Sequence, residues 1–340
     1  MKIKGEIKYL VLWIASDCNL KCKYCYALPN FSHKMMSFET AKRAIESCNT
    51  KKFTLILAGG EPIMNFSLIE KVYQYLKDEE YDCKIGLQTN GTLITKEIAE
   101  KLSKMNINIG ISFDASFKIN DFYRGETKKL IDAIEYFKEN KKQINLNCVI
   151  TDKSIKELEH FIEIAYYFEN IDGIGLDLIR VGERAQKEGI QVASNSDIYN
   201  YLKKAYIRSK EIRKLVGREV KIREIEEIRY RKNNNCNVSS YCYSSLGQAM
   251  VISEKGDIYP CSSLVGNKEY YMGNIFDEKE IEIKKLSSGK KENCYKCKYN
   301  KFCKGYCPSR MIYNKEEAED KDCILRKSIF KILEEEEIND

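Results

Sequence analysis

Short apolar runs alternate with longer amphipathic segments through residues 9–215 of the chain. The apolar runs have the length of buried strands, and the amphipathic segments repeat their apolar positions at helical spacing. Strands are predicted at 9–16, 53–58, 83–89, 107–113, 144–151 and 173–179, and helices at 37–48, 67–77, 95–105, 127–139, 155–168 and 197–215. Short connections between such elements indicate parallel strands joined by crossover helices.

Six strand and helix units are fewer than the eight that close a TIM barrel. We therefore expect an α/β fold, a partial (β/α)6 TIM barrel that stays open along one side. In barrels of this kind the chemistry takes place at the carboxyl ends of the strands. Candidate site residues are therefore those that directly follow the predicted strands.

The alternation stops near residue 225, where the basic and polar run RYRKNNN precedes a cysteine-rich segment. Eight of the fourteen cysteines lie beyond this point. This change of character predicts two domains, at residues 1–225 and 226–340.

Fourteen cysteines in 340 residues suggest either disulfides or metal sites. Disulfide-rich scaffolds are short secreted chains, so metal binding is the better interpretation for a chain of this length. No signal peptide opens the sequence, and no apolar run approaches the roughly 20 residues of a membrane span. We expect a cytoplasmic protein with no membrane partner.

Cys18, Cys22 and Cys25 follow the first predicted strand in the run SDCNLKCKYCYA. Three thiols at this spacing can hold three irons of a four-iron cube and leave the fourth iron without a protein ligand. An open coordination position is where a metal centre does chemistry, so the spacing predicts an enzyme. A zinc knuckle or a disulfide pair is the alternative, and the position directly after a buried strand argues against it.

This cysteine spacing, with Tyr24 before the third cysteine, resembles that of the radical S-adenosylmethionine (SAM) superfamily. The resemblance implies that Cys18, Cys22 and Cys25 form a catalytic 4Fe-4S site whose free iron binds SAM, with Tyr24 beside it. One electron then cleaves the sulfonium, and a 5'-deoxyadenosyl radical abstracts hydrogen from the substrate. A low-potential electron donor such as ferredoxin or flavodoxin is implied as a partner. The cofactor carries the difficult chemistry, and the protein aims it.

The second predicted strand ends in Gly59, Gly60 and Glu61, followed by proline, which resembles the Gly-Gly-Glu-Pro motif of the same superfamily. Two glycines let the backbone approach a ligand closely, and their carbonyl groups and the glutamate can meet an ammonium group. The resemblance implies that this ammonium belongs to the methionine end of SAM. Taken alone, the same residues also suit an ordinary turn.

Ser112 ends the fourth predicted strand, and Arg124 follows it in the run FYRG. By resemblance to related enzymes, Ser112 would reach the SAM ribose and Arg124 would pair with the methionine carboxylate. A turn and a surface charge are the alternatives. Leu178 and Arg180 lie near the end of the sixth strand and could border adenine or substrate, but core packing explains Leu178 equally well and neither is assigned a role.

The cysteines after residue 225 are spaced like those of the SPASM domain, the C-terminal module of radical SAM enzymes that mature peptides and proteins. By analogy with anaerobic sulfatase-maturing enzymes, the resemblance implies two auxiliary 4Fe-4S clusters, and hence three clusters in all. The first would use Cys236, Cys242, Cys261 and Cys307, and the second Cys294, Cys297, Cys303 and Cys323. Fully ligated clusters would conduct electrons or position the substrate. A pair of structural zinc sites is the alternative.

The formal net charge of +6 counts every thiol as neutral. Thiols that bind metal are deprotonated, and with three such clusters the net charge falls to about +1. A nucleic acid partner is therefore not expected.

The SPASM resemblance implies a peptide or protein substrate that is crosslinked, oxidised or epimerised. Ser262 stands where sulfatase-maturing enzymes carry an aspartate that deprotonates the substrate radical. A seryl hydroxyl is a poor general base at neutral pH, so oxidation to formylglycine is disfavoured. Only 17 residues precede Cys18, which is too few for a leader-recognition domain. A separate leader-recognition protein, recognition through the SPASM domain, and a substrate without a leader all stay open.

Two other functions are compatible with the sequence. The first is a radical SAM decarboxylase or oxidase of a tetrapyrrole or another cofactor precursor, which substrate-dependent release of carbon dioxide would indicate. The second is a multi-cluster electron carrier without catalysis, which would leave SAM intact when reduced. The Gly-Gly-Glu-Pro run argues against the carrier.

Overall fold

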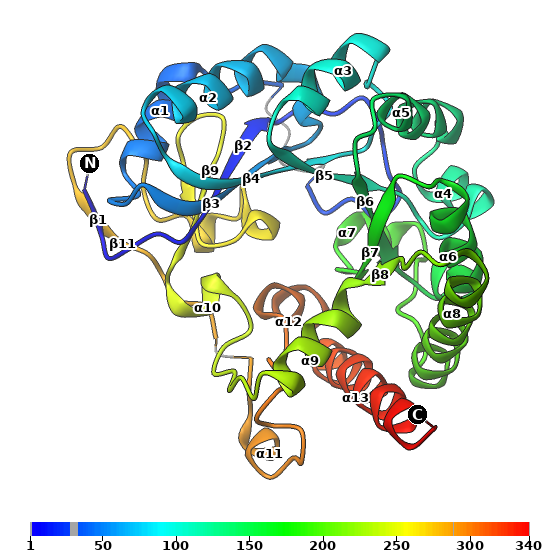
Figure 1. Cartoon of the computed structure of the whole chain (residues 1–340). Coiled ribbons are helices and arrows are strands. Elements are labelled where there is room, and N and C mark those ends of the chain that lie inside the picture. The colour runs from blue at the N-terminus through cyan, green and yellow to red at the C-terminus, as the bar shows by residue number, and fades with distance from the viewer. Residues whose placement is uncertain (1, 28–32, 288, 340) are drawn as a thin grey trace.

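A parallel sheet forms the centre of the molecule and curves into an open arc (Figure 1). The structure is a computed structural model, and it describes residues 2–27, 33–287 and 289–339. Six long strands follow one another across the sheet in chain order. They are β2 (Tyr9–Ala15), β3 (Lys52–Gly59), β4 (Asp82–Thr89), β5 (Ile107–Ser112), β6 (Ile144–Ile150) and β7 (Ile171–Leu178). Each begins and ends within two residues of its predicted bounds, and the predicted partial barrel is confirmed.

The helices that connect these strands cover the outer face of the arc (Figure 1). They are α1 (Phe38–Glu46), α2 (Phe66–Asp78), α3 (Lys96–Lys104), α5 (Thr127–Glu139), α6 (Leu158–Tyr167) and α8 (Asn195–Val216). Side-chain oxygens of Ser37, Thr95 and Ser194 accept backbone N–H groups at the starts of α1, α3 and α8. Such caps satisfy donors that the helix itself leaves unpaired. Ahead of α6, the first turn of the predicted helix is the 3-10 turn η3 (Ser154–Glu157).

Three shorter helical elements have no counterpart in the prediction. A 3-10 turn, η2 (Pro62–Asn65), follows β3. Helix α4 (Phe117–Tyr123) follows β5, and α7 (Glu183–Lys187) follows β7. Each has too few residues to show an apolar pattern at helical spacing. All three follow carboxyl ends of strands, where the chemistry was expected.

Short strands extend both edges of the sheet. Strand β9 (Ala249–Ile252) pairs in parallel with β2, and β10 (Ile258–Tyr259) pairs antiparallel with β9. At the other edge, β8 (Lys221–Ile222) pairs with β7. The full order is β10-β9-β2-β3-β4-β5-β6-β7-β8, while β1 (Lys2–Lys4) and β11 (Glu280–Glu282) form a separate parallel pair. The cysteine-rich region thus covers the backbone edge that β2 would otherwise expose.

The remaining α-helices lie below the open side of the arc in Figure 1. They are α9 (Arg223–Asn233), α10 (Tyr243–Leu246), α11 (Glu292–Tyr295), α12 (Pro308–Asn314) and α13 (Glu316–Asn339). Two 3-10 turns, η4 (Ser262–Leu264) and η5 (Lys268–Tyr270), follow β10. Helix α13 packs on α8, where Lys203 pairs with Glu335 at 2.9 Å and Lys210 with Glu336 at 2.7 Å.

One apolar core joins the barrel to the cysteine-rich region. Ile252 on β9 and Phe330 on α13 are fully buried in the same cluster as the strand residues Leu12 and Leu55. The predicted boundary at residue 225 falls inside α9 rather than in a linker. Among the described residues, none of the helices combines the length and apolar character needed to cross a bilayer.

Candidate functional site

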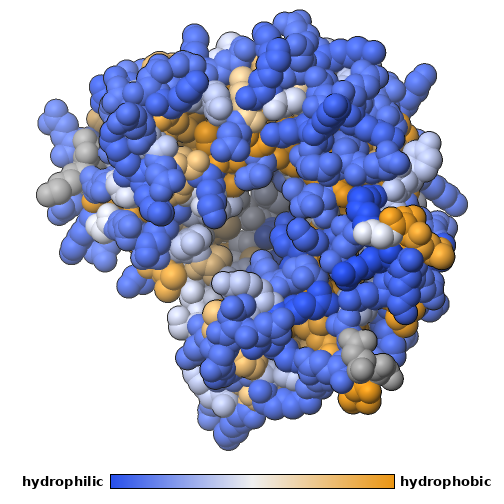
Figure 2. Space-filling model, viewed as in Figure 1, coloured by the Kyte–Doolittle hydropathy of each residue, from blue (hydrophilic) through white to orange (hydrophobic). Residues whose placement is uncertain are grey.

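A cavity of about 900 Å³ occupies the inside of the arc, and Figure 2 shows the molecule hollowed near its centre. A volume of this size is at the upper end of cofactor and substrate pockets. Most of the predicted SAM-site residues border it, namely Cys18, Cys22, Tyr24, Cys25, Gly59, Gly60, Ser112 and Arg124. They come from segments after β2, at the ends of β3 and β5, and after α4. The carboxyl ends of neighbouring parallel strands bring them together.

The three thiols of the loop after β2 are each partly exposed at this cavity. The Leu20 N–H lies 3.4 Å from Cys18 Sγ, and the side-chain amide of Asn90 lies 3.7 Å from the same sulfur. Donors aimed at a sulfur suit a thiolate that binds metal. Burial raises the pKa of Cys18 to about 12 and that of Cys22 to about 11. Both thiols therefore keep their protons at neutral pH until a metal displaces them.

Gly59 and Gly60 hold the cysteine loop through close backbone contacts. The Gly60 N–H donates to the Ala15 carbonyl oxygen at 2.7 Å. A Cβ on Gly59 would lie 2.3 Å from the Ala15 oxygen, and one on Gly60 would lie 2.2 Å from the Asp17 oxygen. No larger residue fits without moving the backbone beside Cys18. The close approach predicted for this pair is thus made to the loop itself, while both glycines also border the cavity.

The resemblance implied that Glu61 meets the ammonium group of SAM, but in the structure its carboxylate contacts other residues of the protein. Its carboxylate is fully buried and is absent from the cavity wall that the described residues form. It accepts the Thr89 hydroxyl at 2.6 Å, the Asn90 N–H at 2.8 Å and the Ile63 N–H at 3.1 Å. Burial raises the pKa of Glu61 to about 7, although the three hydrogen bonds favour the charged form. The carboxylate thus holds the loop that carries Asn90, and a part for Glu61 in binding SAM stays a prediction.

Asp114, which sequence reasoning assigned no role, joins Tyr24 to Arg124. The Tyr24 hydroxyl donates to the Asp114 carboxylate, and Arg124 Nε donates to the same group at 2.9 Å. The Arg124 guanidinium also lies 5.3 Å from the Tyr24 ring centroid. Asp114 is fully buried, and the side chain of Arg124 is nearly so. The arginine borders the cavity with its charge already compensated by Asp114, a partner that the resemblance did not indicate.

A chain of polar side chains lines the cavity beyond Ser112. The Gln88 amide donates to Ser112 Oγ at 3.0 Å and accepts from the Asn147 amide at 2.9 Å. Arg223 Nη1 in turn donates to Asn147 Oδ1 at 3.0 Å. The prediction missed Gln88, Asn147 and Arg223. For Gln88 on β4 and Asn147 on β6, polar residues at alternate positions of otherwise apolar strands were the available signal, whereas Arg223 begins α9 and had none of this kind.

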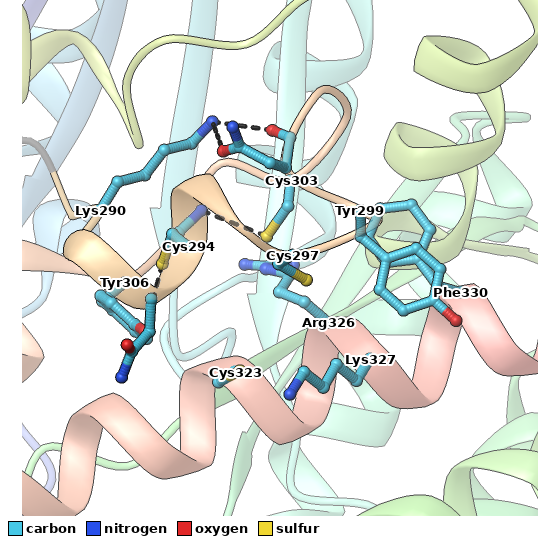
Figure 3. Close-up of a pocket in the computed structure, with 13 residues that line it drawn as sticks. Lys290, Cys294, Cys297, Tyr299, Cys303, Tyr306, Cys323, Arg326, Lys327 and Phe330 are labelled. Carbon is cyan, nitrogen blue, oxygen red and sulfur yellow. Dashed lines mark hydrogen bonds between the residues drawn. The ribbon is translucent and has the colours of Figure 1, made fainter.

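Cys294, Cys297, Cys303 and Cys323 border one pocket of about 90 Å³. Figure 3 shows three of them on α11 and the loop after it, with Cys323 facing them from α13. Arg326 borders the same pocket, is only 3% exposed, and has no hydrogen-bond partner for Nε and Nη1 among the described residues. Buried donors without acceptors are costly. An anionic cluster held by four thiolates would supply the missing acceptors, so this pocket fits the predicted second auxiliary cluster.

Three of the four cysteines predicted for the first auxiliary cluster influence one another. Burial raises the pKa of Cys261, and the charges of Cys307 and Cys242 raise it further. At Cys307 burial acts in the same direction, but Arg310 and Arg180 outweigh it and lower the pKa. Cys236 instead lies near the Asn234 carbonyl oxygen, at 3.6 Å, and its described contacts do not join it to the other three.

Ser262 directly follows Cys261 and borders the large cavity. The next residue, Ser263, accepts the Tyr313 hydroxyl through its carbonyl oxygen at 2.6 Å. The position expected for a general base therefore faces the cavity but carries a hydroxyl.

Comparison with known proteins agrees with these features. The profile of the Radical SAM superfamily matches residues 14–165. An uncharacterized protein of Methanocaldococcus jannaschii is 32% identical over 299 residues, which cover 85% of this chain and 95% of that protein. A cysteine-type anaerobic sulfatase-maturating enzyme of Clostridium perfringens is 29% identical, with 88% of each chain covered.

The fold also matches a solved structure described as native anSMEcpe with bound AdoMet and Kp18Cys peptide. The TM-score is 0.80 at 26% sequence identity, and the match covers 98% of this chain and 99% of that one. The likeness therefore includes both the barrel and the cysteine-rich region below it.

Proposed function

Because this chain belongs to the radical SAM superfamily, we propose that it cleaves SAM reductively and abstracts hydrogen from a peptide or protein, which it thereby modifies. The observation that carries the proposal is the meeting of Cys18, Cys22, Cys25 and the Gly59–Gly60 pair at one cavity. When bound, a 4Fe-4S cluster and SAM supply a carbon-centred radical. The protein's own residues bind, orient and enclose these groups.

In this proposal each side chain has a distinct task. Cys18, Cys22 and Cys25 hold the cluster, and the Leu20 and Asn90 donors stabilise the Cys18 thiolate. Tyr24, Asp114 and Arg124 form a rigid polar wall, because their hydrogen bonds leave little rotational freedom. Ser112 supplies a hydroxyl within the chain of Gln88 and Asn147. Preorganised walls of this kind orient a ligand without reorganisation during the reaction.

The proposal of a peptide or protein substrate is supported by two features, and a third bears on the modification. The cavity has room beyond the cysteine loop, where the Gln88, Asn147 and Arg223 side chains lie. The solved relative contains a bound peptide. Ser262 borders the cavity where a base would be needed for formylglycine formation, and a hydroxyl is a poor base. We therefore propose crosslinking, epimerisation or another oxidation as the modification.

We further propose that residues 226–340 act as a SPASM domain with two auxiliary 4Fe-4S clusters, and residues 1–225 as the radical SAM core. Cys294, Cys297, Cys303 and Cys323 already share a pocket with the unpaired donors of Arg326. For the other set, Cys236 would have to approach Cys242, Cys261 and Cys307 when the cluster is bound.

A low-potential donor such as ferredoxin or flavodoxin is the proposed source of electrons. A separate leader-recognition protein is one proposed means of presenting the substrate. All fourteen cysteines are free thiols in the structure, which suits a reducing compartment such as the cytoplasm.

The cysteine assignment predicts the outcome of one triple substitution. Cys18→Ala, Cys22→Ala and Cys25→Ala together should abolish dithionite-driven formation of 5'-deoxyadenosine from SAM, because no site remains for the cluster that binds it. About eight irons should stay bound, in the two auxiliary clusters. Anaerobic reconstitution, iron analysis and chromatography of the nucleoside measure both quantities.

Cys83→Ala is the matched control, since Cys83 lies on β4 and contacts the Lys51 carbonyl oxygen, outside all three cysteine sets. This variant should keep full SAM cleavage. Undiminished cleavage in the triple variant would refute the assignment. Incubation with peptides encoded beside the gene, followed by mass spectrometry, tests the substrate class separately.

A further inference from the structure

Arg180, which follows β7, lies between the cavity and a cysteine of the first predicted auxiliary cluster. Its Nη1 donates to Asp177 Oδ2 at 2.7 Å, and Asp177 borders the cavity with its side chain 44% exposed. Its Nη2 lies 3.7 Å from Cys307 Sγ. Its Nε donates to Ser309 Oγ at 3.0 Å, and that hydroxyl is itself 3.3 Å from the same sulfur. One guanidinium therefore contacts both a cavity carboxylate and a candidate cluster ligand.

Asp177 is shared with a second arginine from α12. Arg310 Nη1 donates to Asp177 Oδ1 at 2.6 Å, and Nε and Nη2 of Arg310 donate to Asp322 at 2.9 and 2.6 Å. Asp322 Oδ2 also accepts the Cys307 N–H at 3.3 Å. These fixed contacts hold Arg180 and Arg310 on either side of the Asp177 carboxylate, close to Cys307.

This arrangement affects the energy of adding an electron at Cys307. Cys307 is only 6% exposed, so nearby charges act on it with little screening by water or salt. Reduction of a bound cluster by one electron makes the site more negative by one charge. Hydrogen bonds to the sulfur ligands and a nearby cation stabilise the more negative state, and they raise the reduction potential.

We propose that Arg180 raises the reduction potential of the cluster bound through Cys307, and that Asp177 makes this potential depend on the charge of whatever occupies the cavity. A cationic or hydrogen-bond-donating group of a substrate that pairs with Asp177 would offset the negative charge of this carboxylate. The positive charge of Arg180 would then act more strongly on the cluster and raise its reduction potential further. Substrate binding would thus favour electron transfer to the auxiliary cluster. The inference rests on the proposed presence of that cluster.

The test uses the full chain with Cys18→Ala, Cys22→Ala and Cys25→Ala, so that only the auxiliary clusters contribute signals. Dithionite supplies the electrons, one to each cluster, and electron paramagnetic resonance follows the reduction against a set of potentials. Arg180→Met removes the charge and the donors, and it should make one cluster about tenfold harder to reduce. A tenfold change is about 59 mV for one electron. The other cluster should be unaffected.

Two conservative variants give shifts of opposite sign. Arg180→Lys keeps a positive charge but loses the planar fork, so it should lower the same potential by less than Arg180→Met does. Asp177→Asn mimics neutralisation of the carboxylate, and it should raise that potential. If Arg180→Met fails to bind its full complement of iron, these two variants still test the proposal.

Lys327→Met is the reciprocal control. Lys327 borders the pocket of the second cysteine set, and its charge favours the Cys323 thiolate. This variant should lower the potential of the other cluster and leave the first unchanged.

Failure of the inference can be told from failure of the proposed function. Fully loaded variants in which Arg180→Met and Asp177→Asn leave both potentials unchanged overturn only the role of Arg180 and Asp177. A chain that binds no iron through its C-terminal cysteines, even before Arg180 is changed, overturns the auxiliary clusters as well.

Discussion

Glu61 belongs to a predicted ligand-binding motif, but in the structure its carboxylate contacts a neighbouring loop. The Gly-Gly-Glu motif marks a place where a carboxylate is needed, but the fold turns this carboxylate away from the cavity. There it accepts two backbone N–H groups and one hydroxyl, which hold Asn90 beside Cys18. A buried carboxylate with such partners positions a loop at the cost of desolvation, and burial raises its pKa.

The pKa of Glu61 predicts how stability depends on pH. Because it is raised from 4.5 to about 7, the folded protein binds this proton more tightly than the unfolded chain does. This difference in proton binding stabilises the folded protein by about 3 kcal/mol below pH 4.5, and the stabilisation is lost as the pH rises through 7. Glu61→Gln should therefore flatten the decrease in unfolding free energy across this interval, as measured by urea unfolding of the metal-free protein. Glu97→Gln, at an exposed position, should keep the decrease, and equal slopes in both variants would contradict the burial argument.

Helix α4 decides where Arg124 lies, because the arginine immediately follows its last residue. Ser116 accepts the Ile119 N–H at the start of the helix. Inside it, Asn120 accepts the Asp114 N–H at 3.1 Å and donates to Thr127 at 2.8 Å. One short helix thus fixes both partners of the pair between Asp114 and Arg124.

The cap of α4 provides a prediction at this scale. Ser116→Ala should lower the unfolding free energy by about 1 kcal/mol, because the Ile119 N–H loses its acceptor. Thr95→Ala removes the equivalent cap of α3, whose acceptor contacts the Ile98 N–H, and it should have a similar cost. Only Ser116→Ala should also weaken SAM binding by the reconstituted protein, measured by calorimetry, since Arg124 borders the cavity and no residue of α3 is among those that line it. Equal binding by the two variants would show that α4 does not position the arginine.

The whole molecule is held together by contacts between the barrel and the cysteine-rich region. Strand β9 extends the sheet beside β2, α13 packs on α8, and Arg310 links Asp177 on β7 to Asp322 on α13. The side chain of Arg310 is 4% exposed and that of Asp322 is fully buried. Residues of both regions form the cavity wall, so its shape depends on these contacts between them.

Loss of the contacts that Arg310 makes between the two regions should destabilise the whole chain. Arg310→Met leaves the Asp322 charge buried without its partner, and it should cost about 3–5 kcal/mol of unfolding free energy. Urea unfolding of the metal-free protein under reducing conditions provides the measurement. Lys298→Met removes an ion pair with Glu334 at the surface and should have little effect, because exposed pairs contribute little. If both variants unfold at the same urea concentration, the buried pair of Arg310 and Asp322 does not contribute to the free energy of unfolding as proposed.

The sequence by itself determined those features that depend on neighbours along the chain. The six strands and their helices follow from local apolar periodicity, and the cysteine spacing after β2 indicates a cluster that leaves one iron open. Only the tertiary structure decided which distant groups meet. It placed Glu61 against Asn90, Asp114 between Tyr24 and Arg124, and β9 beside β2. It also brought Arg180 to Cys307, 127 positions further along the chain. Such contacts depend on how the elements pack, and no local pattern of residues records that packing.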